Sequence, residues 1–181
     1  MIYVFLADGF EETEAIAPID LLRRAGKEVI TVGVGKKNVT GSHGIPVTAD
    51  TSTDEINNEF ENLEMVILPG GMPGTLNLEA DSTVQKAIDF CMENNKFIGA
   101  ICAAPSILGH RGLLKNKNAI CYKGFEKELE GAFIQNVPAV ADGNIVTSRG
   151  AGTALHFGLK LIEVLISEEK SNEIKESVLF D

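Results

Sequence analysis

A single cysteine stands where an apolar run of the sequence gives way to small residues and a proline. It is Cys102, in the stretch FIGAICAAPSIL at residues 97–108. A cysteine can act as a nucleophile when its thiol ionises, yet free cysteine is also among the most buried residue types. The residue type alone therefore leaves two interpretations of Cys102 open, core packing and nucleophilic chemistry.

The surroundings of Cys102 favour the chemical interpretation. Residues 97–101 predict a buried strand, and Pro105 suits the first turn of a helix, where its missing N–H costs nothing. A thiol between a parallel strand and the next helix faces the helix dipole and unpaired N–H groups, which lower its pKa. The other cysteines fit structural roles, because Cys91 lies on the apolar stripe of a predicted helix and Cys121 in a predicted strand.

An acid among apolar residues is the second candidate. On a helical wheel for residues 14–25, Glu14 falls on the apolar side, between Leu21 and Ala25. Such an acid is either a helix cap or a partly buried group that burial keeps protonated near neutrality, suited to acid–base chemistry. The helix should be distorted locally, because Pro18 cannot donate to the carbonyl of Glu14. Both interpretations of Glu14 stay open.

Two further features lie near these candidates. Gly70 and Gly71 follow a predicted strand at residues 65–68. They either form a turn that needs positive φ or direct backbone N–H groups at a developing oxyanion. Glu11 and Glu12 have an ordinary explanation, because acids are stabilised at the positive end of a helix.

The pattern of elements would bring the candidates together. Strands are predicted at residues 2–7, 28–34, 65–68 and 97–101, helices at 12–25, 82–95 and 152–166, edge-strand material at 37–50, and a hairpin around Asp142-Gly143. Strand–helix alternation predicts an α/β fold with a mainly parallel sheet and helices on both faces. Ligands of such folds collect beyond the carboxyl ends of the strands, where Cys102 and the glycine pair fall.

Composition narrows the class of protein. The chain has 181 residues, 44% hydrophobic and 23% charged, which predicts one domain over residues 1–181 with a sizeable core. A net charge of −10 argues against nucleic acid or an anionic membrane as partner. We expect no signal peptide and no membrane span. The three cysteines form neither a disulfide framework nor a zinc site, so we expect a cytoplasmic protein without a metal.

Four segments in order resemble one family. They are DGFEETEAIAPIDLLRRAG (8–26), LPGGMPGTLNL (68–78), AICAAPSIL (100–108) and DGNIVTSRGAGTALHFGLKLIEVL (142–165). Together they resemble the ThiJ/PfpI family, in particular the branch that contains the parkinsonism-associated deglycase. The resemblance implies a flavodoxin-like α/β sandwich, a homodimer and no cofactor.

The resemblance also implies roles for particular residues. The family's reactive cysteine matches Cys102, and the glutamate that hydrogen-bonds this thiol matches Glu14. The family's backbone amides around the nucleophile match Gly70, Gly71, Cys102 itself and Ala103.

The chain departs from the family in its histidines. Ala103 stands where the protease-like members carry a histidine, and Tyr122 where the closer branch has one. His156 lies on the polar face of a predicted helix, so we expect it to be solvated. His110 follows a predicted helix, where we expect it to act as a cation at the helix C-terminus. His43 lies in a loop that family geometry could bring near the pocket of a partner subunit, so Tyr122 and His43 are candidate pocket residues.

Three functions follow from this constellation. The first is a glyoxalase or deglycase, in which the Cys102 thiolate attacks methylglyoxal-type α-oxoaldehydes or glycated substrates, Glu14 moves protons and backbone amides hold the oxyanion. The second is an oxidative-stress sensor that acts through selective oxidation of Cys102. The third is a cysteine amidase or peptidase, which Ala103 disfavours because no adjacent histidine supplies a base.

Overall fold

A seven-stranded sheet forms the centre of the molecule. The computed structural model describes residues 1–56 and 60–181. In spatial order the sheet contains β10 (Ala139–Asp142), β11 (Ile145–Ser148), β7 (Phe97–Ile101), β6 (Met65–Leu68), β1 (Ile2–Leu6), β2 (Val29–Gly33) and β5 (Thr51–Ser52). All neighbouring pairs are parallel except β10 with β11. Two small ladders lie outside it, β3 (Asn38–Thr40) with β4 (Pro46–Thr48) and β8 (Asn118–Ala119) with β9 (Phe133–Ile134).

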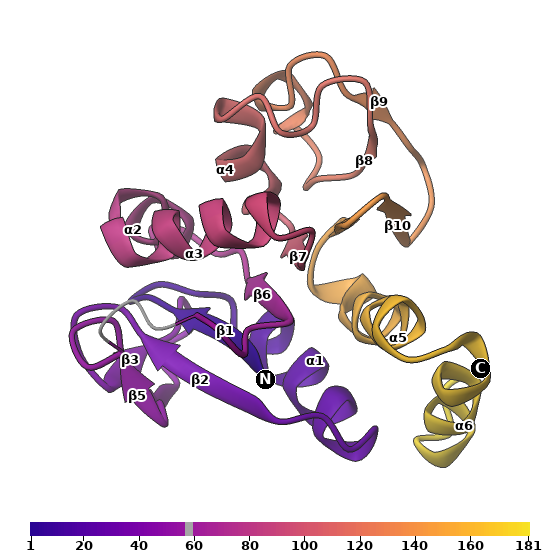
Figure 1. The fold of residues 1–181 in the computed structure, drawn as a ribbon, viewed down its shortest axis with the longest axis horizontal. Helices are drawn as coiled ribbons and strands as arrows, with labels where there is room; N and C mark the ends of the chain where they lie inside the picture. The colour runs from indigo at the N-terminus through magenta and orange to yellow at the C-terminus, as the bar shows by residue number, and fades with distance from the viewer. Residues whose placement is uncertain (57–59) are drawn as a thin grey trace.

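Helices cover both faces of the sheet (Figure 1). One group comprises α1 (Glu12–Arg24), α5 (Ala154–Leu165) and α6 (Glu168–Ser177), and the other α2 (Gly74–Ala80), α3 (Ser82–Glu93) and α4 (Pro105–His110). Short 3-10 turns occur at Glu126–Glu128 and Ala151–Thr153. Within the described ranges, we find no helix that combines the length and apolar character needed to cross a membrane. The arrangement is flavodoxin-like.

Strand alternation divides the core into two layers. Tyr3 and Phe5 of β1 face the cluster that packs against α3 and α4, whereas Ile2, Val4 and Leu6 face the cluster built on α1, α5 and α6. Successive side chains of a strand point to opposite faces, so a strand buried on both sides reads as a continuous apolar run. All five residues of β1 are buried for this reason.

The predicted α/β class, the four parallel strands and the three long helices are confirmed. The Asp142-Gly143 hairpin is also confirmed, with β10 antiparallel to β11. The strand expected around Cys121 is wrong, because β8 ends at Ala119 and Cys121 follows it in irregular structure. Helix α1 continues through Pro18 to Arg24.

Candidate active site

Cys102 occupies a sharp turn between β7 and α4. Its φ is +65°, in the left-handed region that non-glycine residues rarely adopt. Two backbone hydrogen bonds fix this turn: the Cys102 N–H donates to the carbonyl of Ser148 at 3.0 Å, and its carbonyl accepts the Tyr122 N–H at 2.7 Å. A left-handed non-glycine residue costs about 1–2 kcal/mol, and such strain is concentrated at functional sites. The half-buried thiol is therefore held in place by the surrounding backbone.

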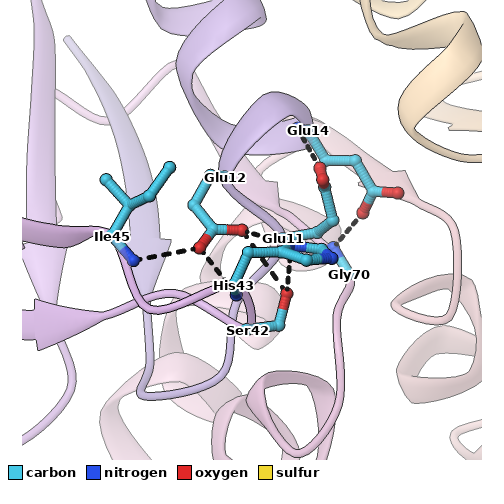
Figure 2. Close-up of polar contacts among 7 residues, drawn as sticks. All are labelled: Glu11, Glu12, Glu14, Ser42, His43, Ile45 and Gly70. Carbon is cyan, nitrogen blue, oxygen red and sulfur yellow. Dashed lines mark hydrogen bonds and ion pairs between the residues drawn. The ribbon is translucent and has the colours of Figure 1, made fainter.

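Glu14 turns from α1 toward this cysteine. Its residue is only 1% exposed, and its Oε2 accepts the Gly70 N–H at 3.0 Å (Figure 2). It also hydrogen-bonds the Cys102 thiol and accepts the Ala151 N–H. The helix cap is Glu11, whose carboxylate accepts the Glu14 N–H at 2.7 Å. Of the two interpretations of Glu14, the structure thus supports the buried acid and excludes the cap.

The two glycines of the predicted oxyanion loop have different roles. Gly71 takes φ of +90°, which explains the glycine as a turn residue. At Gly70, a Cβ atom would lie 2.6 Å from Cβ of Cys102 and 2.7 Å from Oε2 of Glu14, so only glycine allows the two side chains to meet. The Gly70 N–H is engaged by Glu14, whereas the N–H groups of Gly71 and Ala103 point at the Cys102 sulfur.

Burial changes the acidity of both reactive groups. Burial, together with the charge of Glu11, raises the pKa of Glu14 to about 7, against the opposing hydrogen bonds from Cys102, Gly70 and Ala151. Burial also raises the pKa of the Cys102 thiol to about 12, and the Glu14 carboxylate adds to the rise. The lowered thiol pKa expected from the helix dipole is therefore wrong beside an ionised Glu14. The amides of Ala103 and Gly71 favour the thiolate but do not outweigh burial.

The thiol and the acid act as a coupled pair. One of their two protons leaves near neutrality and the second only at high pH, so the pair holds a single proton over the intervening range. When Glu14 carries that proton, the sulfur is a thiolate that accepts N–H bonds from Ala103 and Gly71. Transfer of this proton from Cys102 to Glu14 thus places a nucleophilic thiolate beside a neutral acid, and the net charge of the pair stays the same.

Comparison with known proteins identifies the family of the chain. A family model described as the DJ-1/PfpI family matches residues 1–164. The chain belongs to the DJ-1/PfpI family. It is 35% identical over 179 residues to protein dj-1beta of Drosophila melanogaster, covering 97% of this chain and 95% of the relative. It is 33% identical over 184 residues to glutathione-independent glyoxalase DJ-1 of Schizosaccharomyces pombe, covering 97% and 96%. The solved structure of oxidized Toxoplasma gondii DJ-1 aligns with a TM-score of 0.93 at 33% identity, covering 99% of this chain and 97% of that one.

In this DJ-1/PfpI chain an open groove of about 690 Å³ adjoins the pair. Its lining does not include Cys102 or Glu14, but two lining residues reach them. Ala151 donates its N–H to Glu14, and Tyr122 bonds the Cys102 carbonyl through its own N–H. Gly150 lies between, since a Cβ there would be 3.3 Å from the Tyr122 ring and 3.6 Å from Oε1 of Glu14. The structure therefore brings Tyr122 to the site, 53% exposed.

His43 is held by an acid that the sequence did not single out. The Glu12 carboxylate accepts the backbone N–H of His43 at 2.8 Å and of Ile45 at 3.4 Å, and contacts the His43 ring at 2.9 Å and the Ser42 hydroxyl at 3.4 Å (Figure 2). Burial raises the pKa of Glu12, but these hydrogen bonds outweigh it and bring the pKa down to about 2. One ligand atom each of Glu11, Glu12 and His43 lies within 4.8 Å of the others, but Glu12 is already occupied by the loop. Sequence pattern gives no signal for this contact, because it joins segments about thirty residues apart.

The other two histidines of this DJ-1/PfpI chain lie away from the pair. His110 ends α4, as expected, and contacts Glu79 at 2.6 Å and Glu128 at 2.8 Å, which raises its pKa. The solvated role expected for His156 is wrong, because its ring packs edge-on against Phe180 at 4.8 Å between centroids. Its Nδ1 is buried without a hydrogen-bond partner among the described residues.

Proposed function

We propose that this protein is a cysteine-dependent, glutathione-independent glyoxalase or deglycase that acts on methylglyoxal-type α-oxoaldehydes and their adducts. The observation that carries the proposal is the contact between Cys102 and Glu14, whose pKa lies near neutrality. Catalytic acids and bases work best when their pKa is near the working pH. The relative named as a glutathione-independent glyoxalase supports the same class of reaction.

The proposed chemistry begins with attack of the Cys102 thiolate on the aldehyde carbon, which forms a hemithioacetal. The N–H groups of Gly71 and Ala103, which already bond the sulfur, lie where a developing oxyanion needs donors. Glu14 protonates that oxygen, and its carboxylate then moves a proton from the former aldehyde carbon to the neighbouring carbon. The former aldehyde carbon is oxidised to a thioester while the ketone is reduced to an alcohol. Water then cleaves the thioester, which regenerates the thiol and releases a hydroxy acid such as lactate.

Lactate formation from methylglyoxal tests the proposal. We expect Cys102→Ser to reduce the rate to background, and Glu14→Gln to lower kcat by roughly 10²–10⁴, the usual contribution of a general acid–base group. Cys91→Ser is the matched control, because Cys91 is fully buried in the core on the other face of the sheet. Rates for Cys102→Ser and Glu14→Gln equal to that of the control would overturn the proposal.

A second candidate function is oxidative sensing through the same sulfur. Cys102 is the partly exposed cysteine, whereas Cys91 is 0% and Cys121 6% exposed. A neutral Glu14 would also hydrogen-bond an oxidised sulfur, and one similar structure is of an oxidized protein. Mass spectrometry after mild peroxide should find oxidation at Cys102 first. Equal oxidation of Cys91 and Cys121 would exclude selective sensing.

The amidase or peptidase alternative has less support. Such an enzyme usually pairs its thiol with a histidine base. Among the described residues, the hydrogen-bonding partners of His43 and His110 are other side chains, and no histidine contributes to the environment of Cys102. Position 103 is an alanine and position 122 a tyrosine.

We also propose that the protein acts as a homodimer, as the family resemblance implies. Ile16 of α1 and Ile45 are 45% and 54% exposed, and together with Val47 they line an apolar groove of about 460 Å³. A second copy packed on this groove would cover side chains that are costly to leave in water. Light scattering should give a dimer mass for wild type and for the control Leu179→Lys, and a monomer mass for Ile16→Lys. A monomer mass for wild type would refute the proposed homodimer.

A further inference from the structure

The groove beside the Cys102–Glu14 pair is larger than a small aldehyde requires. Its volume of about 690 Å³ lies within the roughly 300–1,000 Å³ typical of sites for drug-sized ligands. Gly150 and Ala151 are the residues of the lining that approach Glu14. A substrate whose reactive carbonyl lies at Cys102 could therefore extend along the groove, and the rest of the lining would decide which substrates fit.

The lining offers unused hydrogen-bond donors. Arg149, Lys123 and Asn136 line the groove and are exposed, and their side chains form no hydrogen bond or ion pair with another described residue. The acid of the lining, Glu126, accepts the Gly124 N–H at 2.8 Å. Two cations and one acid leave the groove net positive in a chain of net charge −10. A donor-rich positive groove matches an acceptor-rich anionic ligand.

Other residues of the groove lining are apolar. Ile120, Tyr122 and Ile134 contribute to it, and the Tyr122 and Ile134 side chains are 53% and 44% exposed. An aliphatic segment of a ligand could cover this surface while its charged end meets the cations. The lining thus combines residues that approach Glu14, apolar side chains and two cations.

We propose that the groove binds the anionic tail of an extended α-oxoaldehyde and that Arg149 determines this specificity; the proposal rests on the proposed glyoxalase function. Arg149 immediately precedes Gly150, which separates Glu14 from the Tyr122 ring. Its planar guanidinium can bind a carboxylate or a phosphate through two parallel hydrogen bonds, which a lysine cannot do. The preferred substrates carry a carboxylate or phosphate at the end remote from the aldehyde.

The carboxylate-bearing α-oxoaldehyde γ,δ-dioxovalerate is the natural probe. Attack by Cys102 at its aldehyde, proton transfer through Glu14 and hydrolysis of the thioester convert it with one water to α-hydroxyglutarate. The aldehyde carbon is oxidised and the adjacent ketone carbon reduced, so no external oxidant or reductant is needed. Its methyl ester has the same reactive end and almost the same length but no charge.

The experiment compares kcat/KM for the acid and its methyl ester in wild type and Arg149→Gln. We expect wild type to prefer the acid, and Arg149→Gln to lower kcat/KM for the acid by about tenfold, the value of one charge-assisted hydrogen bond. Values for the ester and for methylglyoxal should be unchanged, which also controls for folding. Lys160→Gln, outside the groove lining, should behave as wild type. No preference for the acid, or equal losses for acid and ester, would overturn the proposal.

Two further measurements complete the test. Hydroxypyruvaldehyde phosphate, assayed in parallel, distinguishes a phosphate tail from a carboxylate tail by the larger loss on Arg149→Gln. Levulinate should protect Cys102 from iodoacetamide in wild type but not in Arg149→Gln, and methyl levulinate should protect neither. Protection without turnover of any aldehyde would refute the glyoxalase and keep the anion site, whereas turnover without Arg149-dependent protection or preference would refute the anion site alone.

Discussion

Glu12 and Glu14 lie in the first turn of the same helix, yet their environments push their acidities in opposite directions. The pKa of Glu12 is about 2 and that of Glu14 about 7, from a common ordinary value of 4.5. Both residues have little exposed surface, at 7% and 1%, but the Glu14 carboxyl lies much deeper in the protein than that of Glu12. They point to different neighbours, Glu12 to the loop that contains His43 and Ile45, and Glu14 to Gly70 (Figure 2).

The depth of burial and the donors that surround each carboxylate together explain the difference in pKa. Glu12 receives two backbone N–H groups, and its Oε2 also contacts the His43 ring and the Ser42 hydroxyl. Glu14 receives the N–H groups of Gly70 and Ala151 and the Cys102 thiol, but burial and the like charge of Glu11 outweigh these donors and raise its pKa. One acid is thus kept ionised as a structural anchor, and the other is kept near its titration point for chemistry.

Removing the charge of Glu12 should give the largest loss of stability. We expect Glu12→Gln to lower the free energy of unfolding by about 3 kcal/mol at neutral pH, because N–H donors of the loop lose a charged acceptor. The stabilisation from Glu12 is present above its unfolded pKa and is lost as pH falls toward 2. Urea denaturation measures the change. A loss as small as that of an exposed control such as Glu130→Gln would mean that Glu12 does not anchor the loop.

Removing the charge of Glu14 should raise the stability of the protein, the opposite of the effect at Glu12. The folded protein binds this proton more tightly than the unfolded chain, so wild type loses stability as pH rises from about 4.5 to about 7. Glu14→Gln should therefore be more stable than wild type by on the order of 3 kcal/mol above about pH 8, with little difference near pH 4. Thermal or urea denaturation at both pH values checks this. A gain that does not depend on pH would mean that Glu14 does not titrate near neutrality.

The sequence predicted the role of one acid but not of the other. The apolar side of a helical wheel identified Glu14 because local periodicity places it beside Leu21 and Ala25. The same reasoning gave Glu12 a merely local explanation at the helix N-terminus. Its partners His43 and Ile45 are distant in sequence, and no periodic signal reports a contact of that kind.

The fold was more predictable than the electrostatics. Apolar runs identified β1, β2, β6 and β7, since each is buried on both faces, but the short helix α2 and the polar helix α6 have no clear apolar stripe and were missed. The thiol pKa was predicted in the wrong direction because the helix dipole was weighed without the burial of the sulfur or the charge of Glu14. Those terms depend on tertiary packing.

Glu11, close to Glu14, offers a finer test of what sets the acidity of Glu14. The charge of Glu11 contributes to the raised pKa of Glu14, and its side chain also caps the helix. In Glu11→Gln the amide oxygen can still accept the Glu14 N–H, so the cap survives while the charge is lost. We expect the acidic limb of the alkylation rate of Cys102 to shift downward by about half a pH unit. An upward shift, or none, would show that burial alone sets the acidity of Glu14.

The smallest effect on stability is expected at His43, the exposed partner of Glu12. His43 is 70% exposed at its side chain, and Glu12 raises the pKa of its ring. The resulting stabilisation is present below the unfolded pKa of about 6.5 and fades as pH rises through the raised folded value. His43→Gln should nevertheless keep Tm within about 2 °C of wild type at any pH, because exposed ion pairs contribute little. The backbone N–H groups of His43 and Ile45, which the substitution retains, continue to bind Glu12. If His43→Gln instead lowered Tm as much as Glu12→Gln, and only below about pH 6.5, the loop would depend on the imidazolium. The anchoring role assigned to the two backbone donors would then be wrong.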